Sequence, residues 1–408
     1  MTDRDHDIVL YGASGFVGSL TAGYLAEHAP PGARIALAGR SRERLEATRS
    51  GLPAAAANWP ILVADSTDRA ALAEMAASTT VLVTTVGPYA RYGLPVVQAC
   101  VREGTHYADL TGEVLFVREV ADKFDVAAKK SGARIVHSCG YDSVPSDLAV
   151  LLLHRRAIAE NAGGLLDVQL VAMARGGLSG GTIDSMRSQL ETVTANPELR
   201  RVLGDRHSLS PDRAAEPTPE QPRDAGPPSR TPDGRWTAPF VMASYNTRIV
   251  RRSNALQNWA YGRGLRYGEV MGTGRGPLGG VAAAGVTAGL AGFAAAFGTA
   301  PMRKVLDRML PAPGSGPSEK TREKGWFRST VDATTESGRR FRAVAAGQGD
   351  PGYAATAVML GESGLALALE GDRLPAAAGC LTPATGIGEV LAEHLRAAGH
   401  TYEVTELT

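Results

Sequence analysis

Three glycines near the start of the chain have the spacing of a phosphate-binding turn. They are Gly12, Gly15 and Gly18, in the stretch IVLYGASGFVG. An apolar run precedes them and a helical pattern follows them, which is the order in which a helix N-terminus binds a diphosphate. Gly12 would permit the tight turn, Gly15 the approach of the pyrophosphate, and Gly18 close packing of helix on strand. A glycine-rich turn without a ligand is the alternative. The other turn residues expected to contact a nucleotide are Ser14, Phe16 and Val17.

The end of the next expected strand, residues 35–38, indicates which nucleotide would bind. Sites specific for NAD place Asp or Glu there, to accept hydrogen bonds from the ribose hydroxyls. This chain instead has Gly39, Arg40 and Ser41. A guanidinium can pair with a 2′-phosphate, and the serine adds a hydroxyl donor. We therefore expect NADPH. The alternative is that Arg40 and Arg42 only begin the following helix.

Two later turns complete the expected cofactor site. A third strand, residues 59–65, ends at Asp65, which could contact the adenine amino group. A fourth strand, residues 81–85, is followed by Val86, Gly87 and Pro88. Ligands of open α/β sheets lie beyond the carboxyl ends of the strands. The turn after the fourth strand should therefore border the nicotinamide ribose.

The elements that would position these residues form an α/β protein. Short apolar strands alternate with helical segments through residue 147, which predicts a Rossmann-type doubly wound parallel sheet over residues 1–147. Residues 148–379 should form a second, α+β domain with an antiparallel sheet, including a hairpin that turns at Ser337–Gly338. The C-terminal helix within 380–408 is expected to pack back on the first domain.

Composition excludes several classes of protein. The 408 residues carry a formal charge of +1, without the basic excess of a nucleic-acid-binding protein. The three cysteines are far apart and follow no metal-ligand spacing, so we expect no metal and a reducing compartment. The charged N-terminus lacks an apolar signal region, so we expect a cytoplasmic protein.

Nine motifs together carry a family resemblance. They are YGASGFVG, LAGRSRERL, VGPYARYG, HYADLTGE, CGYDSVPSDL, RGGLSGGTIDS, PFVMASYNTRIVRRSNAL, WAYGRGLRYGEVM and CLTPATGIGEVLAEHL. The first five resemble the saccharopine dehydrogenase-like oxidoreductases, and the others are similar to the trans-acting enoyl reductase branch. The resemblance implies an NADP-dependent reductase that serves a polyketide synthase in trans. Its substrate would be an unsaturated acyl chain on a carrier protein, used in complex lipid biosynthesis.

Reduction of an enoyl thioester needs a hydride at the β-carbon and a proton at the α-carbon. The candidates are Tyr89 and the turn that contains Tyr141 and Asp142. Tyr141 could donate the proton, and Asp142 or Ser143 could orient it. Alternatively these residues only shape the loop, with Ser146 or Asp147 as a helix cap.

Two other functions stay open at this point. One is a reductase of an imine or amino-acid substrate, which would need cations to hold substrate carboxylates. Its candidates are Arg175, Arg248, Arg251 and Arg252. The other is a non-catalytic protein that binds NADPH or lipid.

Two further segments have unusual composition. Residues 208–235 are rich in Pro and charge and should form a mobile loop, either a lid or an inert insertion. Residues 278–297, within the apolar stretch 276–300, carry no charge and precede Arg303, Lys304 and Arg308. This segment is a buried helical hairpin, a membrane-surface anchor or a spanning helix. Small residues would also suit a homodimer interface. With an acyl substrate, peripheral contact with the plasma membrane would be reasonable.

Overall fold

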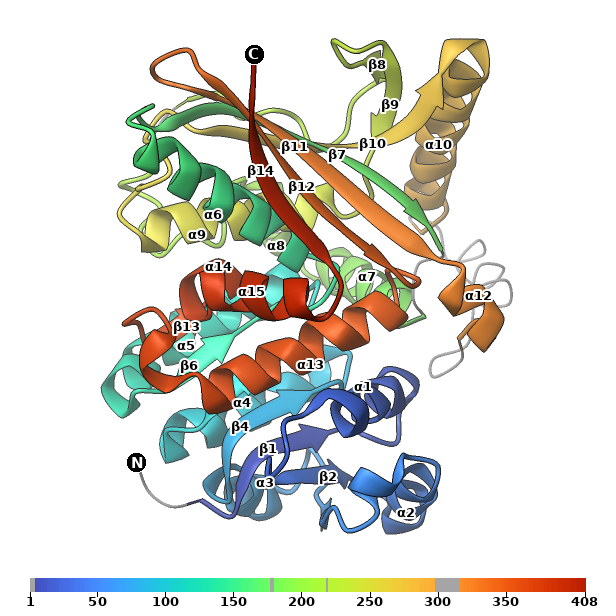
Figure 1. The fold of residues 1–408 in the computed structure, drawn as a ribbon, viewed down its shortest axis with the longest axis vertical. Coiled ribbons are helices and arrows are strands. Elements are labelled where there is room, and N and C mark those ends of the chain that lie inside the picture. The colour runs from blue at the N-terminus through green and yellow to red at the C-terminus, as the bar shows by residue number, and fades with distance from the viewer. Residues whose placement is uncertain (1–3, 177–179, 218, 298–315) are drawn as a thin grey trace.

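Two seven-stranded sheets organise the described part of the chain, residues 4–176, 180–217, 219–297 and 316–408, in this computed structural model (Figure 1). The first sheet has the order β13-β6-β5-β4-β1-β2-β3, and every pair in it is parallel. Its strands are β1 (His6–Tyr11), β2 (Ile35–Gly39), β3 (Ile61–Val63), β4 (Thr79–Thr84), β5 (His106–Ala108), β6 (Arg134–Val136) and β13 (Gly379–Leu381). The predicted Rossmann-type sheet is confirmed.

Helices cover both faces of this sheet because its strands are apolar on both sides. In β1, Ile8 and Leu10 belong to one buried cluster, whereas Val9 and Tyr11 belong to the other. The helices of this half are α1 (Phe16–His28), α2 (Arg42–Ser50), α3 (Arg69–Ala77), α4 (Tyr89–Glu103), α5 (Val114–Ser131), α13 (Ala354–Leu369), α14 (Pro383–Gly386) and α15 (Glu389–Ala397), with short 3-10 turns at Ala54–Ala56 and Gly371–Arg373.

The second sheet has the order β14-β12-β11-β7-β10-β9-β8. Its strands are β7 (Leu165–Arg175), β8 (Ser229–Arg230), β9 (Arg235–Pro239), β10 (Arg266–Arg275), β11 (Trp326–Thr335), β12 (Arg340–Gln348) and β14 (Thr401–Leu407). The helices of this half are α6 (Val144–Ala159), α7 (Gly180–Ala195), α8 (Leu199–Gly204), α9 (Ala243–Leu256), α10 (Gly276–Phe297) and α12 (Glu319–Glu323). The predicted hairpin is β11–β12, with Gly338 at φ 82°.

Three features differ from the sequence-based expectation. The second sheet is mixed rather than antiparallel, because β10 pairs in parallel with β7. Helix α13 packs on α1 and the first sheet, although it was expected in the second domain. The last strand, β14, pairs with β12 in the second sheet, whereas β13 extends the first. The end of the chain thus adds a strand to each of the two sheets. The expected domain boundaries at residues 147 and 379 did not include this arrangement.

Candidate functional site

The glycine turn lies where β1 meets α1, and its backbone explains two of the three glycines. Gly12 has φ 90°, and a Cβ there would lie 2.7 Å from Thr85 Oγ1. A Cβ at Gly18 would lie 2.1 Å from Gly12 O, so α1 packs directly on the turn. Of the residues that the structure describes, a Cβ at Gly15 would meet only Gly12 O, at 3.2 Å. Protein packing therefore requires Gly12 and Gly18, and leaves space at Gly15 for a ligand.

The expected adenosine end of the site lies at the carboxyl ends of β2 and β3. Arg40 is exposed there. Ser41 is the N-cap of α2, and its Oγ accepts the N–H of Arg44 at 3.3 Å. Asp65 Oδ1 accepts the N–H and the hydroxyl of Thr67, at 2.9 and 2.6 Å, and these bonds hold the pKa of Asp65 below its usual value. The chain thus presents an exposed guanidinium at the edge of the sheet.

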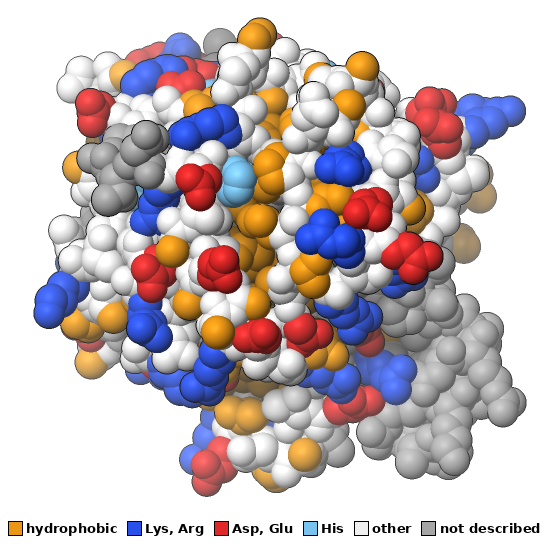
Figure 2. Space-filling model, turned by 90° about the horizontal axis from the view of Figure 1, so that it is seen from below, with side chains coloured by type: hydrophobic (Ala, Val, Ile, Leu, Met, Phe, Trp, Pro, Cys, Tyr) orange, Lys and Arg blue, Asp and Glu red, His pale blue; other side chains and the backbone are white. Residues whose placement is uncertain are grey.

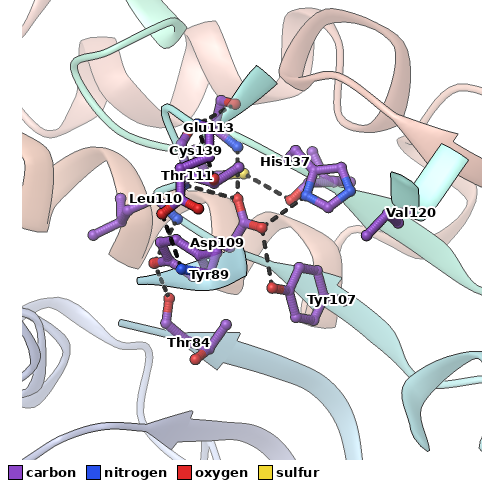
Figure 3. Close-up of polar contacts among 12 residues, drawn as sticks. Thr84, Tyr89, Tyr107, Asp109, Leu110, Thr111, Glu113, Val120, His137 and Cys139 are labelled. Atoms are coloured by element: carbon purple, nitrogen blue, oxygen red, sulfur yellow. Dashed lines mark hydrogen bonds and ion pairs between the residues drawn. The ribbon is translucent and has the colours of Figure 1, made fainter. Parts of the chain in front are cut away.

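The turn after β4 also lies at this edge, and Tyr89 follows it. Gly87, Pro88 and Tyr89 line a cavity of about 510 Å³. The Tyr89 hydroxyl donates to Thr84 O at 3.1 Å and accepts the N–H of Leu110 at 3.1 Å (Figure 3). Because both bonds hold backbone groups, this hydroxyl has a structural role, and we do not propose Tyr89 as the proton donor.

The cavity reaches from the glycine turn into the second half of the molecule. Its walls come from helices α1, α5, α7, α8, α9 and α10, the turns after β4, β5 and β6, and the start of α13 with the segment before it. Residues of these walls include Phe16, Val17, Leu110, Gly112, Val114, Met186, Leu203, Val241, Met242, Tyr245, Phe293, Tyr353 and Thr356. The glycine turn and this adjoining apolar volume fit a nicotinamide nucleotide beside an apolar substrate.

Two carboxyl groups, those of Asp142 and Asp184, line this cavity. Burial raises the pKa of Asp142 to about 7. A Cβ at Gly112 would lie 3.5 Å from Asp142 Oδ2, which places the carboxyl beside the turn after β5. Asp142 can therefore hold a proton near neutral pH, as a general acid requires.

Tyr141 lies behind the cavity rather than on its wall. Its ring packs edge-on against Phe327, with centroids 5.3 Å apart, and its N–H donates to Thr356 Oγ1 at 3.0 Å. Burial raises its pKa far above 10, so it would release a proton reluctantly. Of the two candidates in this turn, the geometry therefore favours Asp142 over Tyr141 as the proton donor. The sequence-based expectation gave that role to Tyr141 and a role in orienting it to Asp142.

A buried polar network fixes the turns beneath the cavity (Figure 3). Asp109 Oδ2 pairs with His137 Nδ1 at 2.7 Å and accepts the Tyr107 hydroxyl at 3.0 Å. Its Oδ1 accepts the N–H groups of Thr111 and Ser138, at 3.0 and 2.9 Å. Asp109 thereby joins the ends of β5 and β6, the strands that lead to Gly112 and Asp142. Among the residues that the structure describes, no cluster of three His, Cys, Asp or Glu could hold a metal ion.

Glu113 was not singled out from sequence, yet it joins two walls of the site. Its Oε1 accepts the N–H of Tyr89 at 2.9 Å and the hydroxyl of Ser185 at 2.7 Å. Its Oε2 accepts the N–H of Ala90 at 2.8 Å. The carboxylate therefore caps α4 and holds α7. No local sequence signal marks it, because Ser185 is 72 residues away.

Cations are missing from the described lining of this cavity. Arg248 bonds to Leu203 O, Asp205 O and Asp224. Arg251 and Arg252 donate mainly to backbone carbonyls, including Tyr267 O and Leu209 O. These bonds attach the start of the proline-rich stretch 208–235 to α9, while its expected mobility stays a prediction. The arginines considered for an imine substrate are thus structural, apart from Arg175, which ends β7 outside the cavity wall.

The uncharged segment forms one continuous helix, α10, which stands beside β9 and β10 at one side of the second sheet (Figure 1). The expectation of a buried hairpin is wrong for its described residues. Gly276–Phe293 is apolar enough to cross a membrane, but only 11% of it is buried. Leu278 and Val281 are 84% and 70% exposed, whereas Phe293 lines the cavity. Arg303, Lys304 and Arg308 lie outside the described residues.

Charge on the surface is mixed. Figure 2 shows basic and acidic side chains interspersed around an apolar strip on the face seen from below, with no broad basic area on that face. Ion pairs such as Arg34–Asp7 at 2.8 Å contribute to this pattern.

Comparison with known proteins gives consistent results. Residues 8–136 match the saccharopine dehydrogenase NADP binding domain. A trans-acting enoyl reductase of Mycobacterium tuberculosis is 46% identical over 416 residues, which cover 100% of this chain and 99% of that protein. A second protein of that species, named provisionally as a trans-acting enoyl reductase, is 50% identical over 416 residues, which cover 100% of this chain and 99% of that protein. Apo saccharopine dehydrogenase (L-Glu forming) from Saccharomyces cerevisiae has a TM-score of 0.55 at 14% identity, covering 98% of this chain and 99% of that one.

Proposed function

Because the chain belongs to the trans-acting enoyl reductase branch of the saccharopine dehydrogenase-like family, we propose that it reduces the C=C bond of an unsaturated acyl chain. The chain is an NADP-dependent oxidoreductase, and NADPH is its cofactor. The acyl chain would be attached to a carrier protein and supplied by a polyketide synthase that acts in trans. Complex lipid biosynthesis is the process that such a product would serve.

The residues that line the cavity are the observation that supports an acyl thioester as the substrate. The space beside the glycine turn is apolar, and its described side chains include two carboxyls but no Lys, Arg or His. A saccharopine-type substrate carries several carboxylates, which would stay unpaired and face Asp142 and Asp184 there. An acyl thioester has no charge to pair at this position. The cavity therefore favours the enoyl substrate over the imine.

The following residues would bind the cofactor and transfer the proton. Gly12, Gly15 and Gly18, with Ser14, Phe16 and Val17, would hold the pyrophosphate. Arg40 and Ser41 would bind the 2′-phosphate, Asp65 the adenine, and Val86, Gly87 and Pro88 the nicotinamide ribose. Bound NADPH supplies the hydride. Asp142 would give its proton to the α-carbon. Met242 lies near that carboxyl, since a Cβ at Gly112 would be 3.5 Å from Asp142 Oδ2 and 3.7 Å from Met242 Cε.

Oxidation of NADPH measured under three conditions tests this function. We expect rapid oxidation with a carrier-bound 2-enoyl thioester, and only background with a saccharopine-type imine or with no substrate. Fast turnover of the imine would support the amino-acid reductase instead. Binding of NADPH without turnover of either substrate would indicate a non-catalytic NADPH- or lipid-binding protein.

Helix α10 suggests how such a substrate arrives. Near its N-terminal end, Leu278 and Val281 are exposed. Near its C-terminal end, Phe293 lines the cavity. A long acyl chain lowers its free energy by moving along an apolar surface rather than through water. We therefore include peripheral contact of α10 with the cytoplasmic face of a membrane in the proposal. A homodimer stays a separate prediction, which light scattering in solution would check.

A further inference from the structure

The glycine turn supplies no basic side chain for the cofactor's phosphates. Between Ile8 and Ala33 the sequence contains neither Lys nor Arg. The N-terminus of α1 offers the equivalent of about half a positive charge. The pyrophosphate of a nicotinamide nucleotide carries two negative charges. A further cation near this turn would therefore strengthen binding.

Arg322 brings such a cation from the other end of the chain. Its guanidinium carbon lies 5.3 Å from the centroid of the Phe16 ring. Phe16 is the first residue of α1, directly after Gly15, and it lines the cavity. Tyr353 contacts the same ring edge-on, at 5.0 Å between centroids. Arg322 is thus beside the helix N-terminus that would bind the pyrophosphate.

Backbone contacts hold Arg322 in this place. Its carbonyl oxygen accepts the N–H of Asp350 at 2.8 Å and that of Gly325 at 3.1 Å. A Cβ at Gly325 would lie 2.4 Å from the Asp350 backbone, so the chain after α12 is packed closely on the end of the β11–β12 hairpin. The chain at Gly316 also approaches the Phe16 ring, where a Cβ would lie 2.2 Å from Cε1. The backbone at Arg322 is therefore fixed by the fold, which keeps the side chain beside the Phe16 ring.

The guanidinium keeps donors for a ligand. One amino group, Nη1, donates to Pro317 O at 2.8 Å. No other hydrogen bond of this side chain, and no ion pair, is found among the residues that the structure describes. Glu319 and Glu323 are exposed on the same short helix and are not ion-paired with it in that part of the chain. An arginine has five N–H groups, so several can reach a phosphate.

We propose that Arg322 binds the pyrophosphate of the nicotinamide nucleotide, so that the second half of the molecule contributes to a site built mainly by the first. The proposal rests on the nucleotide site at the glycine turn, but not on the identity of the reduced substrate. It adds a contact that NADPH and NADH share, whereas Arg40 would contact only the 2′-phosphate of NADPH.

Titration of the purified full chain with NADPH and with NADH, followed by protein fluorescence, tests this assignment. For Arg322→Ala we expect about tenfold weaker binding of both cofactors, the lower range for a charge-assisted contact. Arg40→Ala should weaken only NADPH. Lys320→Ala removes the same charge from the same helix and should change neither. Arg322→Lys should recover part of the affinity, and circular dichroism confirms that each variant is folded.

Three results would overturn the proposal. The first is unchanged affinity of Arg322→Ala for both cofactors. The second is a loss confined to NADPH, which would assign Arg322 to the 2′-phosphate. The third is an equal loss of cofactor affinity in Lys320→Ala, which would indicate only a long-range electrostatic effect of the positive charge. If NADPH binds as expected but no enoyl thioester is reduced, the proposed function fails while the role of Arg322 stands.

Discussion

The carboxyl of Asp142 shows how burial alters one residue's chemistry. Its pKa is raised to about 7 because the ionised form loses hydration in the cavity wall. The protonated form therefore prevails below pH 7 and is lost as the pH rises through about 7. A proton donor with this pKa would work under neutral conditions.

We predict that the rate of enoyl reduction falls as the pH rises above about 7. Asp142→Asn should lower the single-turnover rate by about 10²–10⁴-fold, the range for general acids, and should remove this dependence on pH. NADPH affinity should stay the same. A variant that keeps both the rate and the pH profile would exclude Asp142 as the proton donor. Tyr141→Phe is the matched control, since its hydroxyl would not be used.

Arg40 should decide between the two cofactors. Because it stands where NAD-specific sites carry a carboxylate, we expect the unaltered protein to bind NADPH more tightly than NADH. An exposed charge-assisted contact is worth about 1.5 kcal/mol, so Arg40→Ala should weaken NADPH binding about tenfold. Titration that gives equal affinities for both cofactors in the unaltered protein would contradict this prediction.

Single residues were predictable from sequence where a local pattern fixes the backbone. Gly12 and Gly18 belong to this group, because a turn and a close helix contact restrict what can stand there. Glu113 and Arg322 do not, because their partners Ser185 and Phe16 are 72 and about 300 residues away. Only the folded chain brings such residues together.

At the scale of elements, α4 and α7 are joined through one carboxylate. The Ser185 hydroxyl donates to Glu113, whose other bonds cap α4. Ser185→Ala should therefore release α7, with a loss of stability of about 1 kcal/mol. We expect a higher KM for the acyl substrate and unchanged affinity for NADPH, measured by steady-state kinetics and titration.

Thr192→Val is the control for this prediction. In the part of the chain that the structure describes, the Thr192 hydroxyl bonds only within α7, to Ser188 O at 2.8 Å, so its loss should leave KM unchanged. An identical KM in Ser185→Ala and the unaltered protein would show that the link does not shape the substrate site.

The strands of the first sheet that precede residue 147 were predictable because parallel strands are short apolar runs between helices, whereas β13 was not predicted. The parallel pairing of β7 with β10 was not, since the two strands are far apart in sequence and β7 alternates between buried and more exposed residues, as antiparallel strands commonly do. The placement of α13 was also missed. A helix that is apolar nearly all round gives no sign of which sheet it will cover.

At the scale of the whole molecule, helix α10 extends from the outer surface of the protein to the wall of the cavity. We predict weak binding to anionic liposomes through this helix, detected by flotation. Leu278→Glu combined with Val281→Glu should abolish flotation, since both side chains are exposed and would otherwise lie in lipid. Val126→Glu changes an equally exposed apolar residue, 82% exposed on α5, and should have no effect.

Salt gives a second criterion for this contact. The basic residues that follow α10 in sequence should each add about 1 kcal/mol on anionic lipid, a contribution that salt screens. Flotation should therefore weaken at high salt and when Arg303 and Lys304 are changed to Glu. A protein that never floats would contradict the membrane contact and leave the reductase activity unaffected.

The most direct test of the account follows the hydride itself. NADPH that carries deuterium at its transferable position is mixed with the protein and a carrier-bound 2-enoyl chain, and the intact carrier is analysed by mass spectrometry. We predict a saturated chain that contains one deuterium at the β-carbon and one solvent hydrogen at the α-carbon. An enoyl chain that is still unsaturated after NADPH has bound, or a saturated chain without deuterium, would contradict the proposed reduction.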